Sequence, residues 1–239
     1  MGKSAIEWTR FTKNYFTGCD KLSPACEHCY AEPLSLRLMA MGQVKYANGF
    51  KFTIHPKVLP ELREEMGYCF INSMSDTHHS LAPDAINREA FEIMRACQYN
   101  RYQDLSKRPL RMLNFQRDFY PDGFPENVWA GTTVESRDYF GRAELLKRVR
   151  AKVRFLSCEP LLAPLGKVDL TGIHWVIVGG ESGPFHRPIK KAWIDEIREQ
   201  CEFQGVAFFF KQWGGRTPKA GGRSLDGKEW NQMPNGGSR

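Results

Sequence analysis

Three of the chain's seven cysteines lie within one short stretch, GCDKLSPACEHCYAE, which spans residues 18–32. Cys19, Cys26 and Cys29 have the spacing C-x6-C-x2-C, and the aromatic residue Tyr30 follows directly. No fourth cysteine stands nearby in the sequence. A four-iron cluster normally binds four thiolates. Three thiolates would leave one iron with an open position, as a catalytic metal has when it must meet a substrate.

Two other interpretations of the same cysteines stay open. Cys26 and Cys29 form one C-x2-C pair, so a structural zinc ion could be completed by His28, by His55 or by the pair His78–His79. No second C-x2-C or H-x3-H pair accompanies them. The three thiols could also be ordinary buried side chains, as we expect for Cys69, Cys97 and Cys201, which fall inside strand or helix patterns. A [4Fe-4S] cluster is the interpretation that the loop favours, and a cluster with an open iron can chelate S-adenosylmethionine and support radical chemistry.

Polar residues follow most of the strands that the sequence predicts. In a parallel barrel the functional groups gather where the strands end and their loops begin. The candidate site residues of this kind are Ser73, Ser75, Asp76, Lys107, Arg108, Glu135, Cys158, Glu159, Glu181 and Lys211. Each one alone could be a turn or cap residue, but together with the cysteine loop they predict one site at one end of a barrel.

Short apolar, β-prone runs alternate with amphipathic helical stretches and define these elements. The clearest strands are expected at 68–74, 127–134, 152–158, 174–180 and 206–213, with weaker ones at 6–10, 51–55 and 101–106. Helices are expected at 31–42, 83–98, 109–119, 137–149 and 191–203. This order predicts an α/β fold with a parallel sheet, a (β/α) barrel that is either complete with eight strands or partial with six. Residues 1–213 would form this single domain, and 214–239 a tail rich in Gly and basic residues.

The composition limits the function further. The chain has 239 residues, an apolar share of 41% and a formal net charge of +7, which favours an anionic partner such as a nucleic acid or nucleotide. We expect no membrane partner, because no apolar run is long enough to cross a bilayer. The start, MGKSAIEW, lacks the apolar region of a signal peptide. These features predict a cytoplasmic protein, where thiols stay reduced and clustered cysteines bind metal or do redox chemistry.

The cysteine loop after a predicted first strand resembles that of the radical S-adenosylmethionine superfamily, although the usual spacing there is C-x3-C-x2-C. A closer resemblance covers almost the whole chain. The segments IEWT, TGCDKLSPACEHCYAE, YANGF, NSMSD, SKRP, RFLSCEPLL, WVIVGGESG and FFFKQWG are similar to those of an uncharacterised phage and bacterial family with three cysteines and a radical-S-adenosylmethionine-like barrel. That family is distantly similar to spore photoproduct lyase, a radical enzyme that repairs thymine lesions in DNA.

The resemblance implies roles for individual residues. Cys19, Cys26 and Cys29 would ligate the cluster and Tyr30 would pack beside it. Gly179, Gly180 and Glu181 resemble the superfamily's motif for the methionine amino group, although they come late in the chain. Cys158 would donate a hydrogen atom, unless it is a small core residue. The remaining candidates would bind S-adenosylmethionine (Ser73, Ser75, Asp76, Lys107, Glu135, Glu159 and Lys211) or a substrate phosphate (Arg108 and Arg187).

Together these observations predict a radical S-adenosylmethionine enzyme that receives an electron from an external donor and repairs or modifies a nucleic acid or nucleotide. The alternative is a nucleic-acid-binding protein that carries zinc or a cluster without catalysis.

Overall fold

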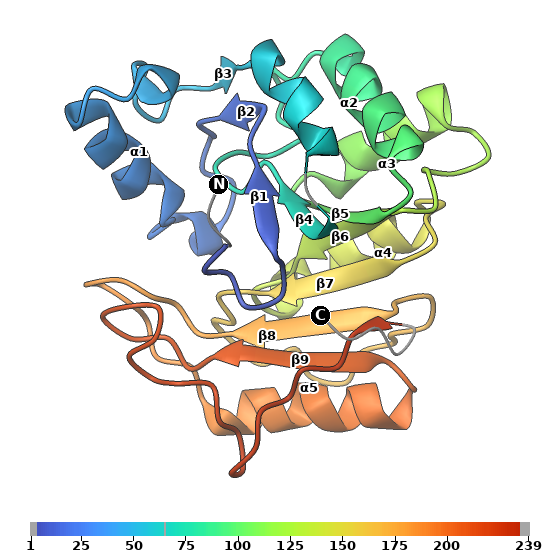
Figure 1. Cartoon of the computed structure of the whole chain (residues 1–239). Coiled ribbons are helices and arrows are strands. Elements are labelled where there is room, and N and C mark those ends of the chain that lie inside the picture. The colour runs from blue at the N-terminus through green and yellow to red at the C-terminus, as the bar shows by residue number, and fades with distance from the viewer. Residues whose placement is uncertain (1–3, 65, 235–239) are drawn as a thin grey trace.

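The computed structural model describes residues 4–64 and 66–234, and a curled sheet of seven parallel strands runs through it (Figure 1). The strand order, β1-β4-β5-β6-β7-β8-β9, follows the order of the chain. The strands are β1 (Phe11–Lys13), β4 (Gly67–Ile71), β5 (Asn100–Ser106), β6 (Val128–Thr133), β7 (Arg154–Cys158), β8 (Trp175–Gly179) and β9 (Ala207–Gln212). Because each strand pairs in parallel with the next, all their carboxyl ends lie at one edge. Two further short strands, β2 (Phe16–Thr17) and β3 (Thr53–Ile54), pair antiparallel beside this sheet.

Helices lie in five of the six crossovers between successive parallel strands, and an irregular segment, 159–174, joins β7 to β8. The helices are α1 (Ala31–Ala40), α2 (Asp84–Ala96), α3 (Pro109–Phe119), α4 (Gly141–Lys147) and α5 (Lys191–Phe203). Four short 3₁₀ helices are η1 (Pro24–Cys26), η2 (Val44–Tyr46), η3 (Pro56–Arg63) and η4 (Arg137–Tyr139). In Figure 1 helix α1 stands apart from the sheet, at the end where the arrow of β8 points. The sheet and its helices therefore form a partial barrel, with the first helix beside its carboxyl-terminal end.

The sheet is covered by apolar side chains on both sides, which explains why the sequences of its strands are nearly continuous hydrophobic runs. The larger core, the helix-facing core, includes Tyr102, Leu156 and Val178. The smaller one, the inner core, consists of Trp8, Phe70, Trp129, Val153, Phe155, Trp175, Ile177, Phe209 and Met233. Gly131 of β6 is required in the inner core, because a Cβ there would stand 2.3 Å from the Phe155 ring. The inner core fills part of the space that the curled sheet encloses.

Most of the expected elements are present. The five clearest strands and the weaker one at 101–106 are confirmed, and so are the helices, although 137–149 is divided into η4 and α4. The expectation of six or eight strands was wrong in number, since the parallel sheet of the described residues has seven. Residues 6–10 do not form a strand, because their backbone turns on itself, with Thr9 N–H donating to the Ile6 carbonyl at 3.3 Å. This turn places Trp8 in the inner core. Residues 51–55 contribute only β3, outside the parallel sheet.

The described part of the tail packs against the domain. Leu225 and Trp230 are buried in the helix-facing core, and Met233 is buried in the inner core. The tail also runs along the outer edge of β9, where Phe210 N–H donates to the Trp230 carbonyl at 2.9 Å. Residues 235–239, which the sequence also assigned to the tail, lie outside the described residues. The tail thus covers an edge strand whose backbone groups would otherwise be unpaired.

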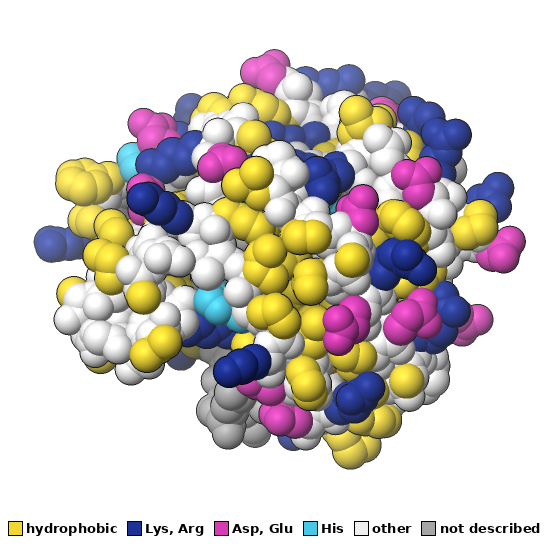
Figure 2. All heavy atoms as spheres, turned by 90° about the horizontal axis from the view of Figure 1, so that it is seen from above, with side chains coloured by type: hydrophobic (Ala, Val, Ile, Leu, Met, Phe, Trp, Pro, Cys, Tyr) yellow, Lys and Arg dark blue, Asp and Glu magenta, His cyan; other side chains and the backbone are white. Residues whose placement is uncertain are grey.

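The surface carries charges of both signs. Figure 2 shows Lys and Arg side chains interspersed with Asp and Glu over the face seen from above Figure 1, so positive charge is not gathered into one patch on that face. Within residues 4–64 and 66–234, none of the helices combines the length and apolar character needed to span a bilayer.

Candidate cluster and substrate site

The cysteine loop leaves β2 at Gly18, whose backbone φ is +78°. A Cβ at this position would stand 2.3 Å from the Lys51 carbonyl oxygen, so only glycine fits. Gly18 N–H donates to the Met74 carbonyl at 2.9 Å, and the Ser75 hydroxyl donates to the Gly18 carbonyl at 2.6 Å. Ser75, which the sequence predicted as a cofactor-binding residue, therefore fixes the backbone that carries Cys19.

Cys26 is the last residue of η1, and Cys29 lies in the turn between η1 and α1. Cys26 N–H donates to the Ser23 carbonyl at 2.8 Å, and Cys29 N–H donates to the Cys26 carbonyl at 3.4 Å. Glu32 N–H, at the start of α1, donates to the Cys29 carbonyl at 3.2 Å, and the backbone N–H groups of Ala31 and Glu32 act to lower the pKa of the Cys29 thiol. Backbone N–H groups at a helix N-terminus favour negative charge beside them. The turn therefore supports a thiolate at Cys29.

None of the three loop thiols forms a disulfide. Burial, and secondly the charge of Asp76, raises the pKa of Cys19 to about 11, against the opposing effect of Arg108, whose Nη1 lies 3.7 Å from the Cys19 sulfur. Burial also raises the pKa of Cys29, while the backbone donors and the charge of Lys107 act to lower it. Cys19 and Cys29 therefore hold their protons at neutral pH, and a metal must displace these protons on binding.

Asp76 joins the loop to the end of β5. Its Oδ1 accepts from the Ser106 hydroxyl at 2.6 Å, and its Oδ2 accepts from Lys107 N–H at 3.1 Å and Arg108 Nη1 at 3.0 Å. Burial by itself would raise the pKa of Asp76, but the Arg108 charge and the Ser106 hydrogen bond hold it below its ordinary value of 3.8. The structure thus brings Asp76, Arg108 and Cys19 together.

Tyr30 follows Cys29 and reaches across to the end of β4. Its hydroxyl donates to the Ser73 carbonyl, and the Ser73 hydroxyl donates to Asn14 Oδ1 at 3.2 Å. Tyr30 is 52% exposed overall, but its hydroxyl end is buried, and this burial, followed by the charges of Cys29 and Glu159, raises the pKa of the hydroxyl. The loop, the end of β4 and the inner side of the sheet are therefore close to one another at Tyr30.

The inner side of the sheet carries an ion pair above the inner core. Lys211 Nζ lies 2.9 Å from Glu159 Oε1, while Trp8 Nε1 and the Ser157 hydroxyl donate to Glu159 Oε2 at 3.0 and 3.1 Å. Gly179 lies against this pair, because a Cβ there would stand 3.1 Å from Glu159 Oε1. The partial barrel thus presents Glu159, Gly179 and Lys211 together, and Trp8 is a partner that the sequence prediction missed although it lies in the segment IEWT.

Glu181, just beyond β8, accepts an unusual number of hydrogen bonds. Its Oε2 accepts from the Arg187 backbone N–H at 2.8 Å and from Arg187 Nε at 2.9 Å, and its Oε1 accepts from Arg187 Nη2 at 2.6 Å. His28 Nδ1 lies 3.1 Å from Oε2. Burial works to raise the pKa of Glu181, but these hydrogen bonds outweigh it and lower the pKa to about 2. Both Glu181 and Arg187 are thus engaged with each other, and His28 is a further contact that the sequence prediction missed.

Two other candidates lie on or near the helix-facing side. Glu135 is buried, and its Oε2 accepts a hydrogen bond from Arg142 Nη1 at 2.8 Å. Cys158 is fully buried and belongs to the helix-facing core, whereas its neighbour Ser157 faces the inner side. A hydrogen-atom donor to a substrate inside the barrel would have to face inward. The catalytic role of Cys158 stays a prediction, and its placement matches the core interpretation.

The side chains near the cysteine loop can be compared with what a zinc ion and a four-iron cluster each require as ligands. The histidines weighed as zinc ligands have partners elsewhere: Glu181 for His28, Thr17 for His55, Asp104 for His78 and Asp20 for His79. Among residues 4–64 and 66–234, no group of three His, Cys, Asp or Glu side chains is arranged to hold a single ion. In a four-iron cluster each thiolate binds a different iron, so the sulfurs need not converge on one point. The loop's set of three soft sulfur donors fits a cluster of this kind.

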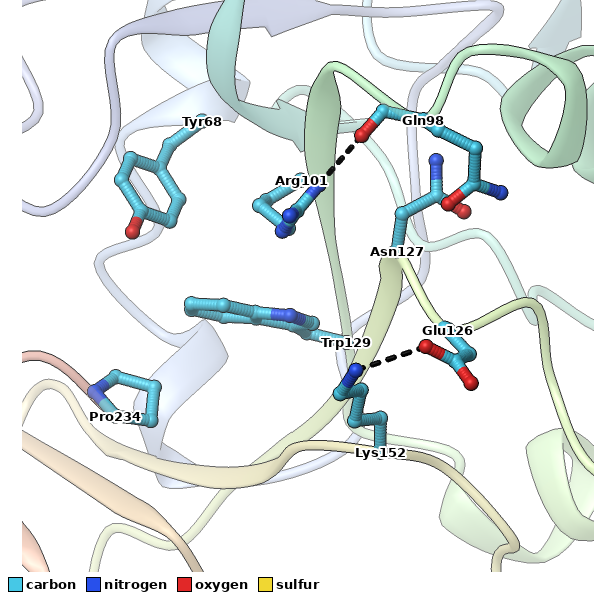
Figure 3. A pocket seen from close by; sticks show the side chains of 8 residues that line it. All are labelled: Tyr68, Gln98, Arg101, Glu126, Asn127, Trp129, Lys152 and Pro234. Carbon is cyan, nitrogen blue, oxygen red and sulfur yellow. Dashed lines mark hydrogen bonds and ion pairs between the residues drawn. The ribbon is translucent and has the colours of Figure 1, made fainter. Parts of the chain in front are cut away.

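A separate cavity of about 250 Å³ lies at the opposite, amino-terminal end of the strands. Figure 3 shows the Tyr68 and Trp129 rings on its wall, with Arg101 and Lys152 nearby. Both cations already have partners, since Arg101 Nη1 donates to the Gln98 carbonyl at 2.7 Å and Lys152 Nζ to Glu126 Oε2 at 2.8 Å. In βα barrels this end usually serves stability. We therefore place the candidate site at the carboxyl-terminal end.

The comparisons with known proteins agree with the fold. None of the curated proteins compared matches the chain. A solved structure of a spore photoproduct lyase with a Tyr-to-Phe substitution superposes with a TM-score of 0.55 at 11% identity, over 89% of this chain and 79% of that one. Another, of spore photoproduct lyase complexed with dinucleoside spore photoproduct, has a TM-score of 0.48 at 12% identity, over 84% of this chain. This chain spans 63% of the length of that second protein, less than two thirds. A family model described as "Protein of unknown function (DUF5131)" matches residues 3–234, nearly the whole sequence, so the chain belongs to this family.

Proposed function

We propose that this protein is a radical S-adenosylmethionine enzyme in which Cys19, Cys26 and Cys29 hold a [4Fe-4S] cluster. One observation carries the proposal: three free thiols lie in one loop at the carboxyl-terminal end of a partial parallel barrel. The likeness to a spore photoproduct lyase supports the fold on which this chemistry would occur. When bound, the cluster would supply an electron to S-adenosylmethionine and so give access to 5′-deoxyadenosyl radical chemistry.

The chain's own residues would bind and orient the reactants. Backbone N–H groups of Ala31 and Glu32 would stabilise the Cys29 thiolate, and the Asp76–Arg108 pair would place a guanidinium beside Cys19. Gly179 and Gly180 let the site's own groups pack closely, because a Cβ would stand 3.1 Å from Glu159 Oε1 at the first position and 2.0 Å from the Trp213 carbonyl oxygen at the second. Lys211 uses one of its three donors on Glu159 and keeps others for an oxygen of the cofactor or substrate. Trp8, Ser157 and the buried aromatic residues below Glu159 would close the site toward the inner core.

The substrate class that we propose is a nucleic acid or nucleotide. The net charge of +7 supports an anionic substrate, and spore photoproduct lyase, by its name, acts on a photoproduct. The guanidinium groups of Arg108 and Arg187 already donate hydrogen bonds to carboxylates, Arg108 to Asp76 and Arg187 to Glu181 and Glu27. To bind a substrate phosphate, they would have to divide these N–H donors between the carboxylates and the phosphate. An external electron donor would complete the system.

The first experiment is to measure iron, acid-labile sulfide and zinc after anaerobic purification, together with release of 5′-deoxyadenosine from S-adenosylmethionine under a strong reductant. We expect about four irons per chain and cofactor cleavage. Both should be lost in Cys26→Ala and kept in the matched control Cys97→Ala, because Cys97 is a buried thiol at the end of α2.

Each other outcome points to a different function. Zinc without sulfide or cleavage would contradict the proposal and favour a zinc-bearing binding protein. An intact, reducible cluster that neither binds nor cleaves S-adenosylmethionine would favour a structural or electron-transfer role. Iron retained in Cys26→Ala would show that the assigned ligand set is wrong.

A further inference from the structure

We propose that Arg187 is a positioning residue that latches the cysteine loop onto the end of β8, and that Glu181 is the anchor of this latch. The inference deepens the proposed function and rests on it for its purpose, since the loop is the one assigned to the cluster. The latch itself is a feature of the protein without any metal, so it can be tested separately.

The guanidinium of Arg187 bridges two segments that lie far apart in the sequence. On one side it forms a fork with both oxygens of Glu181, at 2.9 Å from Nε and 2.6 Å from Nη2. On the other side Nη2 donates to the Pro24 carbonyl at 2.8 Å and Nη1 donates to Glu27 Oε2 at 3.0 Å. Pro24 and Glu27 stand on either side of Cys26. One side chain therefore holds both flanks of the second cysteine.

His28 adds a second connection to the same anchor. Its Nδ1 lies 3.1 Å from Glu181 Oε2, and the residue directly precedes Cys29. The contacts of Pro24, Glu27 and His28 thus lie just before and between the two cysteines of the C-x2-C pair. The Ser75 and Arg108 contacts described above hold Cys19. The loop is fixed to the barrel at two separate places, and Arg187 accounts for one of them.

The anchor is rigid because the tail packs against its backbone. Gly215 N–H donates to the Glu181 carbonyl at 3.0 Å. A Cβ at Gly180 would stand 2.0 Å from the Trp213 carbonyl oxygen, and one at Gly214 would stand 2.1 Å from the Glu181 carbonyl oxygen. The backbones therefore approach so closely here that glycine is needed on both sides. A carboxylate held this firmly can define the position of a loop.

The same contacts give Glu181 a role different from binding a free amino group. Its Oε2 already accepts from two nitrogens of Arg187 and contacts His28, and its Oε1 accepts from Arg187 Nη2. Only 4% of its side chain is exposed. An ammonium group of a ligand would have to displace the fork, which is the geometry in which arginine binds a carboxylate most strongly. Glu181 thus acts on the loop through Arg187.

The test measures how fast each cysteine is alkylated by iodoacetamide in the metal-free protein under reducing conditions, with the modified residues identified by mass spectrometry. We expect Cys26 and Cys29 to react at least several-fold faster in Arg187→Ala than in the unaltered chain. Arg187→Lys should fall between the two, because lysine keeps the charge but cannot form the fork. Arg137→Ala is the matched control, since Arg137 likewise donates to loop carbonyls, those of Leu165 and Lys167, away from the cysteine loop.

The buried thiols report whether a variant has simply lost its fold. Cys97 and Cys201 should react equally slowly in every variant, and global unfolding would expose them together with the loop cysteines. If Arg187→Ala unfolds, the charge-neutral pair Glu181→Gln with Arg187→Gln replaces it, because it leaves no buried charge without a partner. Unchanged reactivity of Cys26 and Cys29 in a folded variant would overturn the latch.

The alkylation test of the latch and the iron and sulfide measurement of the cluster can fail independently of each other. Faster alkylation in the variants with no iron in the unaltered protein would support the latch and contradict the cluster. A cluster in the unaltered protein with unchanged alkylation in the variants would contradict the latch alone. If both hold, the Arg187 variants should also take up less iron and sulfide on reconstitution than Arg137→Ala.

Discussion

Lys211 and Glu159 form an ion pair on the inner side of the barrel, and the exposed pair Lys152–Glu126 has nearly the same geometry. The nitrogen–oxygen distances are 2.9 and 2.8 Å, but the side-chain exposures are 20% and 12% for the inner pair against 54% and 77% for the outer one. We predict that Lys211→Met lowers the free energy of unfolding by about 2 kcal/mol, because it leaves a mostly buried carboxylate without its cation. Lys152→Met should cost about 0.5 kcal/mol or less.

Urea denaturation of the two variants checks this prediction, and the double variant Lys211→Met with Glu159→Gln should recover part of the loss. Equal effects at Lys211 and Lys152 would show that the inner pair is as well solvated as the outer one. That result would also remove the argument that Lys211 is positioned for a ligand.

At the scale of elements, the start of β7 is joined to the residue before β8 through a histidine. Arg154 N–H donates to His174 Nδ1 at 3.0 Å, and burial, followed by the Arg154 charge, lowers the pKa of His174 below 6.5. The folded chain therefore binds fewer protons than the unfolded chain just below pH 6.5, so stability decreases as the pH falls through that value. His174→Asn removes this contribution, and we predict a flatter dependence of unfolding free energy on pH between 8 and 5.5.

The measurement is urea denaturation at several pH values in this range. The flattening should be partial, because His55 and His79 also have lowered pKa values and titrate in the same direction. At pH 8 the loss should stay within about 1 kcal/mol, because the Asn Oδ1 can still accept from the Arg154 N–H. An unchanged pH dependence would contradict the assignment of this titration to His174.

Local sequence patterns predicted the strands and helices better than the contacts between residues far apart in the sequence. The strands at β6 and β8 and helices α3 and α5 were visible in apolar periodicity, which depends only on neighbouring residues. The segment 6–10 has the composition of a strand, but long-range packing of Trp8 onto Phe70 and Trp175 decides its conformation. The cysteine loop was recognisable from spacing, whereas the Arg187 contacts were not, because no pattern relates residue 187 to residues 24 and 27.

At the scale of the whole molecule, the tail contributes to the stability of the barrel. Trp230 is buried, packs at 5.8 Å from the Phe208 ring, and has Lys228 Nζ 3.7 Å from its own ring centre. We predict that Trp230→Ala lowers the free energy of unfolding by about 3 kcal/mol. This corresponds to a fall in the midpoint of thermal unfolding of roughly 10 °C for a chain of this length.

Thermal unfolding followed by circular dichroism is the measurement, with Arg216→Ala as the control. Arg216 is an exposed residue of the same tail, and its replacement should change stability by less than about 0.5 kcal/mol. A small effect of Trp230→Ala would support the sequence-based division of the chain after residue 213.

The latch also bears on when the protein can mature during synthesis. Arg187 Nη2 donates to a carbonyl 163 residues earlier in the chain, and the glycines that support its anchor come later still. At ribosomal speeds this separation corresponds to roughly ten to thirty seconds of translation. During that interval the cysteine loop has left the ribosome but its partner has not been made. The final shape of the loop is therefore set only after the last strand is complete, which leaves a period in which cellular assembly factors could still reach its thiols.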